Sequence, residues 1–342
     1  MKRVLCGFLL ICVMLSGCRQ LGPITPEQKQ YNATFLDLFD TVTTIVGKAD
    51  SEAEFQQIAQ AVHDDLQHYH QLFDIYNDYD GINNLKTVND SAGNAPVTVE
   101  SAIILLLSDC KEYYEATAGK VNVAMGSVLQ LWHNARSDSI DDPANAYLPD
   151  QAALAQAAKH TDFNNVIIDQ AASTVYISDP QLRLDVGAVA KGWATQLVAE
   201  CAPQGLLISV GGNVCATGPK DDQGTSWVVG IENPDGGNYL QKLNISNSCV
   251  VTSGDYQRYF VVDGKPYHHI IDPLSLQPGA YWRSVTIVCN DSGLADALST
   301  ALFLMPRSIG QMVLDQYNAE AMWVDAQGKI FYSPGFESFI KS

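Results

Sequence analysis

Residues 292–306 read Ser292-Gly-Leu-Ala-Asp-Ala-Leu-Ser-Thr-Ala-Leu-Phe-Leu-Met-Pro306 and are almost wholly apolar. The pattern predicts a short buried helix, with Ser292 as N-cap and Pro306 just beyond its end. Asp296 and Thr300 interrupt the run four residues apart, so they lie on the same helical face. A hard cation such as Mg²⁺ would satisfy both oxygens. The structural alternative pairs Asp296 with a lysine or a backbone N–H and bonds Thr300 back to its own helix.

The N-terminus has the pattern of a secretory leader. Lys2 and Arg3 precede an apolar run, Val4–Leu15, that is too short to span a bilayer as an ordinary helix. The segment Leu15-Ser-Gly-Cys18 resembles the bacterial lipobox, in which the cysteine is lipidated. The alternative is a plain signal peptide with an incidental Cys18. The lipobox predicts three segments: a signal peptide (residues 1–17), a lipidated cysteine with a tether (18–30) and a folded domain (31–342).

The charge balance of the chain restricts its partners. The formal net charge is −18, and removal of the leader with Lys2 and Arg3 takes it to about −20. Nucleic acid is excluded as a partner because phosphate binding requires a basic surface. An acidic surface does not dock on anionic lipid, so the lipid on Cys18 must provide the membrane anchor. We expect a protein anchored to the cell membrane on its extracytoplasmic side, either periplasmic or outer.

Cysteine usage gives no sign of a zinc centre. Five cysteines follow the lipobox, widely spaced and without a CxxC pair or a Cys/His cluster: Cys110, Cys201, Cys215, Cys249 and Cys289. Most are expected to be small buried residues. One disulfide is possible outside the cytoplasm, but the sequence does not select the pair.

Hydrophobic periodicity predicts an α+β fold, because strands and helices are mixed without regular alternation. No repeat or linker divides the mature chain, which predicts one compact domain or two intimate subdomains. Helices are expected at 50–72, 101–118, 151–160 and 188–200. Strands are expected at 165–169, 174–178, 182–186, 206–210, 226–232, 241–245, 249–252, 259–262 and 284–289, with a closing hairpin at 322–325 and 329–332.

Three segments carry groups suited to chemistry. Asp185-Val-Gly-Ala-Val-Ala-Lys191-Gly joins a strand to a helix start, where phosphate binds well, although an Asp185–Lys191 ion pair bracing a turn explains it equally. Ser209-Val-Gly-Gly-Asn213 permits close backbone approach to a ligand, or forms a plain turn. His268-His269-Ile-Ile-Asp272 offers a metal ligand or a general base. The structural alternative is a histidine held by Asp272.

Together, eight segments in order resemble the ApbE family of FAD:protein FMN transferases, formerly described as thiamine-biosynthesis lipoproteins. The resemblance runs from about Phe39 to the C-terminus. Its segments are Phe39-Asp-Thr-Val, Tyr76–Asn89, Gly119-Lys-Val-Asn-Val-Ala-Met-Gly126 with Leu131-Trp132, Asp185–Gly192, Val210-Gly-Gly-Asn213, Thr252-Ser-Gly-Asp-Tyr256, His269-Ile-Ile-Asp-Pro273 and Ala295-Asp-Ala-Leu-Ser-Thr300.

The resemblance implies a T-fold-related α+β architecture of mixed sheets flanked by helices. It also implies transfer of FMN from FAD to a Thr or Ser hydroxyl of an extracytoplasmic electron-transfer flavoprotein, with release of AMP. By the same analogy His269 is the candidate general base. Asp272, close to it in the sequence, is the candidate residue to orient it. The implied Mg²⁺ ligands are Asp296, Thr300 and the backbone carbonyl of Ala188. The implied FAD contacts are Phe39, Tyr76, Ala124, Met125, Gly126, Asp185, Lys191 and Ile271.

Two segments depart from the family pattern. Phe39-Asp40 stands where the family often has Met-Gly, so the Phe could still contact the flavin on a different local backbone. Asn122-Val-Ala-Met replaces the common Asp-Pro-Thr-Val. Two other functions share parts of the pattern: an FAD pyrophosphatase giving FMN and AMP, and a lipoprotein that only binds FAD. A binding protein needs no base beside a metal pair, so His269, Asp296 and Thr300 favour catalysis. The sequence leaves open the acceptor, the oligomeric state and whether one or two metal ions bind.

Overall fold

A computed structural model describes residues 28–341. The predicted signal peptide and the lipidation site at Cys18 lie outside the described residues. Within residues 28–341, no helix is both long and apolar enough to cross a membrane.

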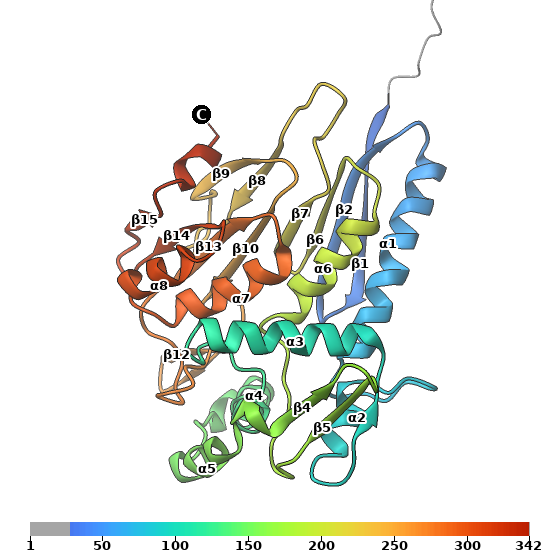
Figure 1. Ribbon diagram of the computed structural model, residues 1–342. Coiled ribbons are helices and arrows are strands. Elements are labelled where there is room, and N and C mark those ends of the chain that lie inside the picture. The colour runs from blue at the N-terminus through green and yellow to red at the C-terminus, as the bar shows by residue number, and fades with distance from the viewer. Residues whose placement is uncertain (1–27, 342) are drawn as a thin grey trace, which may run out of the picture.

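The centre of the fold is an eight-stranded sheet in which every pairing is antiparallel (Figure 1). The order β1-β2-β6-β7-β10-β13-β14-β15 brings strands from both ends of the sequence together. The strands are β1 (Lys29–Leu38), β2 (Thr41–Ala49), β6 (Leu206–Val210), β7 (Asn213–Ala216), β10 (Cys249–Gly254), β13 (Ser284–Cys289), β14 (Glu320–Val324) and β15 (Ile330–Tyr332). The predicted closing hairpin is confirmed as β14–β15.

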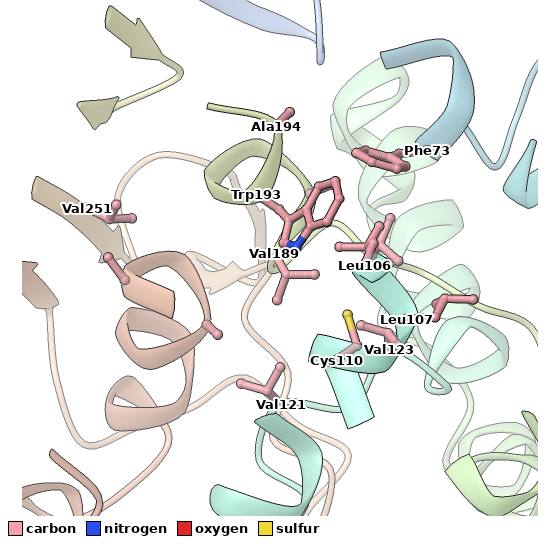
Figure 2. Packing of buried hydrophobic residues seen from close by; sticks show 14 of the residues in the cluster. Phe73, Leu106, Leu107, Cys110, Val121, Val123, Val189, Trp193, Ala194 and Val251 are labelled. Carbon is pink, nitrogen blue, oxygen red and sulfur yellow. The ribbon is translucent and has the colours of Figure 1, made fainter. Parts of the chain in front are cut away.

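Helices cover one face of this sheet, and a further helix runs across their ends (Figure 1). The covering helices are α1 (Glu52–Phe73), α6 (Ala190–Cys201), α7 (Ser292–Phe303) and α8 (Arg307–Leu314), and the crossing helix is α3 (Ser101–Ala116). Trp193 of α6 lies beside Phe73 and Leu106 (Figure 2), with its ring edge-on to that of Phe73 at 5.6 Å. Its N–H donates to Asp109 at 2.7 Å. Burial of such large apolar side chains provides the main stabilisation of the helix layer.

The opposite face of the sheet packs on a separate hairpin. This hairpin consists of β8 (Trp227–Ile231) and β9 (Gln241–Ile245), with the 3₁₀ turn η4 (Phe336–Phe339) beside it. Side chains alternate along the strands, so Val250 and Val288 face the hairpin while Val251 and Ile287 face the helices. This period of two is the strand pattern that the sequence predicts.

A smaller part of the fold lies beyond one end of the sheet, in the lower part of Figure 1. It contains α2 (Leu85–Asp90), α4 (Gly126–Asp141), α5 (Gln151–Ala157) and the three-stranded sheet of β3 (Val97–Thr98), β5 (Thr174–Ile177) and β4 (Val166–Asp169). Three 3₁₀ turns are η1 (Pro143–Asn145), η2 (Ala158–His160) and η3 (Phe163–Asn165), and a last hairpin is β11 (Tyr259–Val262) with β12 (Lys265–His268). One hydrophobic cluster includes Phe55 of α1 together with Phe163 and Val175 of the smaller part. The two parts therefore share a core, and the α+β class is confirmed.

Two local predictions are wrong. Residues 182–186 form no strand, because their N–H groups pair elsewhere: Leu184 donates to the side chain of Asn89 at 2.7 Å and Asp185 to the carbonyl of Val123 at 2.8 Å. A single bridge from Arg183 to Met125 remains. The N-cap of α7 is Asp291, whose carboxylate accepts the N–H of Leu294 at 2.9 Å, so Ser292 is already helical.

Candidate active site

A cleft of about 710 Å³ lies where the sheet, the start of α6, α4 and the β11–β12 hairpin meet. Most of the predicted site residues line it: Phe39, Tyr76, Met125, Asp185, Ala188, Lys191, His269, Ile271, Asp296 and Thr300. Ala124, Gly126 and Asp272 are outside the lining. A smaller cavity of about 290 Å³ between α1 and α6 contains none of these residues. The larger cleft is therefore the candidate active site.

Asp296 of α7 is buried, with 4% of its surface exposed, and its carboxylate is fixed through one oxygen. Oδ2 accepts the backbone N–H of Gly192 at 2.9 Å and the side-chain amide of Asn213 at 2.8 Å. The ammonium group of Lys191 approaches the same oxygen at 3.7 Å. Among the described residues, no hydrogen bond ends on Oδ1. The carboxylate therefore has one committed oxygen and one that is free to bind a ligand.

Gly192 brings helices α6 and α7 into direct contact. A Cβ at this position would collide with the carbonyl of Ser292 and with Cβ of Asp296. The contact also redirects a helical hydrogen bond, because the N–H of Gly192 would otherwise bond to the carbonyl four residues earlier. That carbonyl belongs to Ala188, and within residues 28–341 no backbone N–H donates to it. Ala188, which lines the cleft, thus presents a carbonyl oxygen that accepts no backbone N–H among the described residues.

Thr300 lies one turn after Asp296 on α7. Its hydroxyl is 3.4 Å from that of Ser253, which forms a shorter hydrogen bond of 2.7 Å with Ser299. The structural alternative, a bond from Thr300 back to its own helix, is not formed; Ser299 makes such a bond instead, to the Asp296 carbonyl at 2.9 Å. The hydroxyl of Thr300 is therefore only weakly engaged at the cleft.

These three oxygens fit a magnesium ion. Asp296 Oδ1, the carbonyl of Ala188 and the hydroxyl of Thr300 are hard donors that line one cleft, and each lacks a strong partner among the described residues. In the same part of the chain, no group of three His, Cys, Asp or Glu side chains is placed to hold a metal. The donor set therefore suits Mg²⁺, which keeps water and substrate phosphates as further ligands, better than it suits zinc.

His269 follows β12 directly, opposite Arg258 at the open end of the β11–β12 hairpin. The carbonyl of Arg258 accepts both the backbone N–H of His269 at 3.1 Å and its ring Nδ1–H at 3.2 Å. Because a carbonyl only accepts, Nδ1 carries the proton and Nε2 keeps a lone pair. Burial within the cleft, followed by the charges of Arg258 and Arg136, lowers the pKa of His269 to about 3. The ring is therefore neutral and able to accept a proton at neutral pH.

Asp272 does not orient His269. Its carboxylate accepts from Lys120 Nζ at 2.8 Å and from the N–H of Leu274 at 2.8 Å. In the described chain, no hydrogen bond joins Asp272 to His269. The role expected of this carboxylate is taken by the backbone carbonyl of Arg258, and Asp272 forms a largely buried ion pair instead.

Basic side chains concentrate at the cleft despite the negative charge of the chain. Lys120, Arg136, Lys191 and Arg258 all line it. The Asp185–Lys191 ion pair, the structural alternative for this segment, is absent from the described residues. Asp185 instead accepts the N–H of Gly187 at 2.9 Å, and burial raises the pKa of its carboxyl group. The cations and the start of α6, which no side chain caps, provide an environment suited to a dinucleotide's phosphates.

Comparison with known proteins identifies the family. The model of the ApbE family matches residues 39–323. The chain belongs to the ApbE family.

Several ApbE relatives are similar over most of the chain. A Klebsiella pneumoniae protein named FAD:protein FMN transferase is 29% identical over 348 residues, covering 96% of this chain and 95% of that protein. A Treponema pallidum protein of the same name is 36% identical over 240 residues, covering 65% of this chain. The match spans 64% of the Treponema protein's length, which is less than two thirds.

Solved ApbE structures share the fold. The ApbE protein of Thermotoga maritima superimposes with a TM-score of 0.81 at 28% identity, covering 92% of this chain and 100% of that one. The flavin transferase ApbE of Vibrio cholerae gives a TM-score of 0.77 at 21% identity, with the same coverage. The architecture described above is therefore the ApbE architecture.

Phe39 and Asp40 depart from the ApbE sequence pattern, but their backbone retains the conformation of a turn that favours glycine. The two residues connect β1 to β2 with φ of 53° and 51°, a region that favours glycine. Leu38 pairs with Thr41 across this two-residue turn, as expected for a type I′ hairpin. Phe39 lies in the lining of the cleft, with its ring edge-on to His70 at 5.3 Å.

An aromatic pair occupies another wall of the ApbE cleft. Tyr76 stacks on His133 with ring centroids 5.5 Å apart, and burial raises the pKa of the Tyr76 hydroxyl to about 12. The guanidinium group of Arg136 lies 3.2 Å from Nδ1 of His133. Planar rings beside cations suit a ligand that combines aromatic rings with phosphates.

The two other predicted FAD contacts, Ala124 and Gly126, lie behind the residues that line the cleft. Ala124 is fully buried, and its N–H donates to the side chain of Asn122 at 2.9 Å. The N–H of Gly126 donates to the carbonyl of Arg183 at 2.9 Å. Both positions support Met125, which does line the cleft. Sequence reasoning missed His133, Arg136 and Arg258; their only signal was positive or aromatic character in an acidic chain.

Proposed function

We propose that this protein transfers FMN from FAD to a Thr or Ser hydroxyl of an extracytoplasmic flavoprotein, in a Mg²⁺-dependent reaction that releases AMP. The observation that supports it best is the pairing of two groups in one cleft. Asp296, Ala188 and Thr300 offer free hard oxygens, and His269 offers a free nitrogen lone pair. The names of the ApbE relatives support the same reaction.

The volume and charge of the cleft support FAD as the substrate. A space of about 710 Å³ falls in the range of small-molecule and cofactor sites. Lys191 and Arg258 would neutralise the pyrophosphate, and Tyr76 with His133 would contact a planar ring. Magnesium held by the oxygens of Asp296, Thr300 and Ala188 would neutralise further phosphate charge.

His269 is placed to remove the proton of the acceptor hydroxyl. In the proposed reaction that hydroxyl oxygen attacks the phosphorus on the FMN side, and the phosphoanhydride bond to AMP breaks. The proton passes to Nε2 of His269, and AMP leaves with the bonding electron pair. The negative pyrophosphate would raise the pKa of His269 from its low value, which makes the ring a better base when substrate is bound.

The location of the protein in the cell is also part of the proposal. We infer that residues 1–17 are removed and that Cys18 is lipidated and anchors the enzyme on the extracytoplasmic side of the membrane. Labelling cells with a fatty-acid analogue tests this, with Cys18→Ser as the control. Label on the native chain and none on Cys18→Ser is expected. Equal labelling of both would refute the anchor.

One reconstitution tests the activity. The protein is incubated with FAD, Mg²⁺ and a secreted FMN-binding domain that carries a candidate acceptor threonine, and flavin fluorescence is read on the denatured acceptor. Covalent flavin with equimolar AMP is expected, and an acceptor lacking that hydroxyl should stay unlabelled. Free FMN and AMP without labelled acceptor would establish a pyrophosphatase instead. Intact FAD would leave a binding lipoprotein.

A further inference from the structure

Three cysteines lie side by side in the central sheet, under the helices. Cys249 of β10 is directly opposite Cys215 of β7 on one side and Cys289 of β13 on the other. Directly opposite residues of antiparallel strands point to the same face. All three are buried, at 0%, 4% and 5% exposure for Cys249, Cys215 and Cys289. The structure contains them as thiols.

The hydrogen-bond ladder distinguishes the two pairs. The N–H of Ala216 donates to the carbonyl of Ser248 at 3.0 Å, one residue beyond the pair on each strand. Cys215 and Cys249 are therefore a non-hydrogen-bonded pair, in which Cα atoms are about 4.5 Å apart and side chains are closest. The N–H and C=O of Cys249 then point toward β13, so Cys249 and Cys289 form the wider, hydrogen-bonded kind of pair.

Disulfide geometry favours the closer pair. A disulfide requires Cα atoms about 4.4 to 6.8 Å apart and Cβ atoms about 3.5 to 4.5 Å apart. A non-hydrogen-bonded pair meets the second condition better because its side chains approach more closely. The neighbouring thiol of Cys215, followed by burial, raises the pKa of Cys249.

We propose that Cys215 and Cys249 are a disulfide-forming pair, which joins β7 to β10 when the chain folds in an oxidising environment. The oxidant is a disulfide, either of an oxidoreductase or of a small thiol. One cysteine thiolate attacks it, forms a mixed disulfide and releases one thiol. The second cysteine attacks the protein-bound sulfur and releases the other thiol. The two protons and two electrons lost by the cysteines end on the two released thiols.

The order of the chain allows this chemistry before the thiols are covered. The two cysteines are 34 residues apart in the sequence, and both precede α7. After folding, Gln196 of α6 lies 3.9 Å from the sulfur of Cys249, and α7 packs on β10. A disulfide made during folding is therefore shielded from reductants afterwards. The joined strands carry Asn213 and Ser253, which contact α7 at the candidate metal site.

Refolding with disulfide mapping tests the pair. The reduced, unfolded full chain is refolded in mixed reduced and oxidised glutathione, unfolded again in denaturant with an alkylating agent, and digested without reductant. Mass spectrometry should find the Cys215–Cys249 peptide, with Cys110 and Cys289 alkylated. A Cys249–Cys289 peptide, or alkylation of all three sheet cysteines, would overturn the proposal.

Variants and thermal unfolding provide independent readouts. Cys289→Ser should retain the linkage, whereas Cys215→Ser should leave Cys249 alkylated. The wild-type chain refolded with oxidant should melt at a higher temperature than the chain refolded under reducing conditions, because the bond restricts the unfolded chain. In Cys215→Ser this difference should vanish. Equal melting temperatures of the wild type after refolding with and without oxidant would contradict the proposal without any variant.

Discussion

Asn213 donates its side-chain amide to Oδ2 of Asp296 at 2.8 Å, and both residues are buried. Groups that hydrogen-bond to a metal-ligating carboxylate fix its orientation and tune its affinity for the metal. We predict that Asn213→Ala weakens metal binding by about 10- to 100-fold. Titration with Mn²⁺, followed by electron paramagnetic resonance, measures this directly. The exposed Asn94→Ala is the matched control, and equal affinity in a folded Asn213→Ala variant would refute the role.

Replacement of Asp296 should separate metal binding from stability. Asp296→Ala removes the acceptor for the Gly192 N–H and the Asn213 amide, which should cost about 1–3 kcal/mol of unfolding free energy. Mg²⁺-dependent turnover should disappear. Asp296→Asn keeps the volume and should fold with a smaller loss, yet be equally inactive. Full Mg²⁺-dependent turnover in either variant would show that the metal ligands lie elsewhere.

The pH profile should identify His269 as the base. Its pKa is about 3 in the free cleft, below the ordinary 6.5, so the acid limb of kcat/KM should lie well below pH 6.5. Pyrophosphate charge raises the pKa in the complex, so the limb of kcat should lie at higher pH. His269→Ala should retain FAD binding, measured by flavin fluorescence quenching. It should lose FMN transfer, and any residual activity should show neither acid limb. Normal transfer rates in this variant would mean that another group activates the hydroxyl.

The same histidine makes stability depend on pH. Because the folded pKa is depressed, the unfolded chain binds more protons between about pH 3 and pH 6.5. This contribution to stability is therefore complete above pH 6.5 and is lost as the pH falls through that window. Denaturant unfolding of wild type and His269→Ala at pH 7 and pH 4.5 measures it, and the variant should lose less on acidification.

Asp272 should behave as a structural residue. Asp272→Asn breaks the ion pair with Lys120, whose side chains are 14% and 15% exposed, and should cost about 1–3 kcal/mol in stability. The acid limb of the activity profile should not move. A double-mutant cycle with Lys120→Met isolates the energy of the pair. A shift of the acid limb of the activity profile in folded Asp272→Asn would show that Asp272 does orient His269.

The turn at Phe39-Asp40 offers a stabilising substitution. Asp40 has a φ of 51°, where a Cβ is unfavourable. Asp40→Gly should raise the unfolding free energy by about 0.5–1 kcal/mol. Asp40→Ala keeps the Cβ and should be less stable than Asp40→Gly. Chemical denaturation compares the two, and the reverse order would show that a Cβ at this φ does not destabilise the turn.

Much of the fold could be predicted because apolar periodicity reports burial directly. The helices α1 and α3 and the β14–β15 hairpin follow from it. Residues 182–186 show the limit: their apolar side chains are buried where the chain crosses α4, and burial alone does not provide strand partners.

The candidate site shows a second limit. Asp296 and Thr300 were recognisable as polar residues in an apolar helix, and the cleft contains both. The sequence does not identify the Arg258 carbonyl as the partner of His269, because every residue has a carbonyl and only the fold determines which one lies beside the ring. Asp272 was assigned to His269 by closeness in sequence, whereas its partner Lys120 is 152 residues away.

The contact of Gly192 with α7 has a consequence for how this chain can vary. The residue separates two helices by the thickness of a bare backbone, and the same N–H fixes the carboxylate on the facing helix. The distance between α6 and α7 and the hydrogen bond that holds the Asp296 carboxylate thus both depend on Gly192, which has no side chain. No compensating change at Asp296 could accommodate a larger residue there, since the obstruction includes the main chain of Ser292. Substitution at Gly192 would therefore have to displace the whole of helix α7.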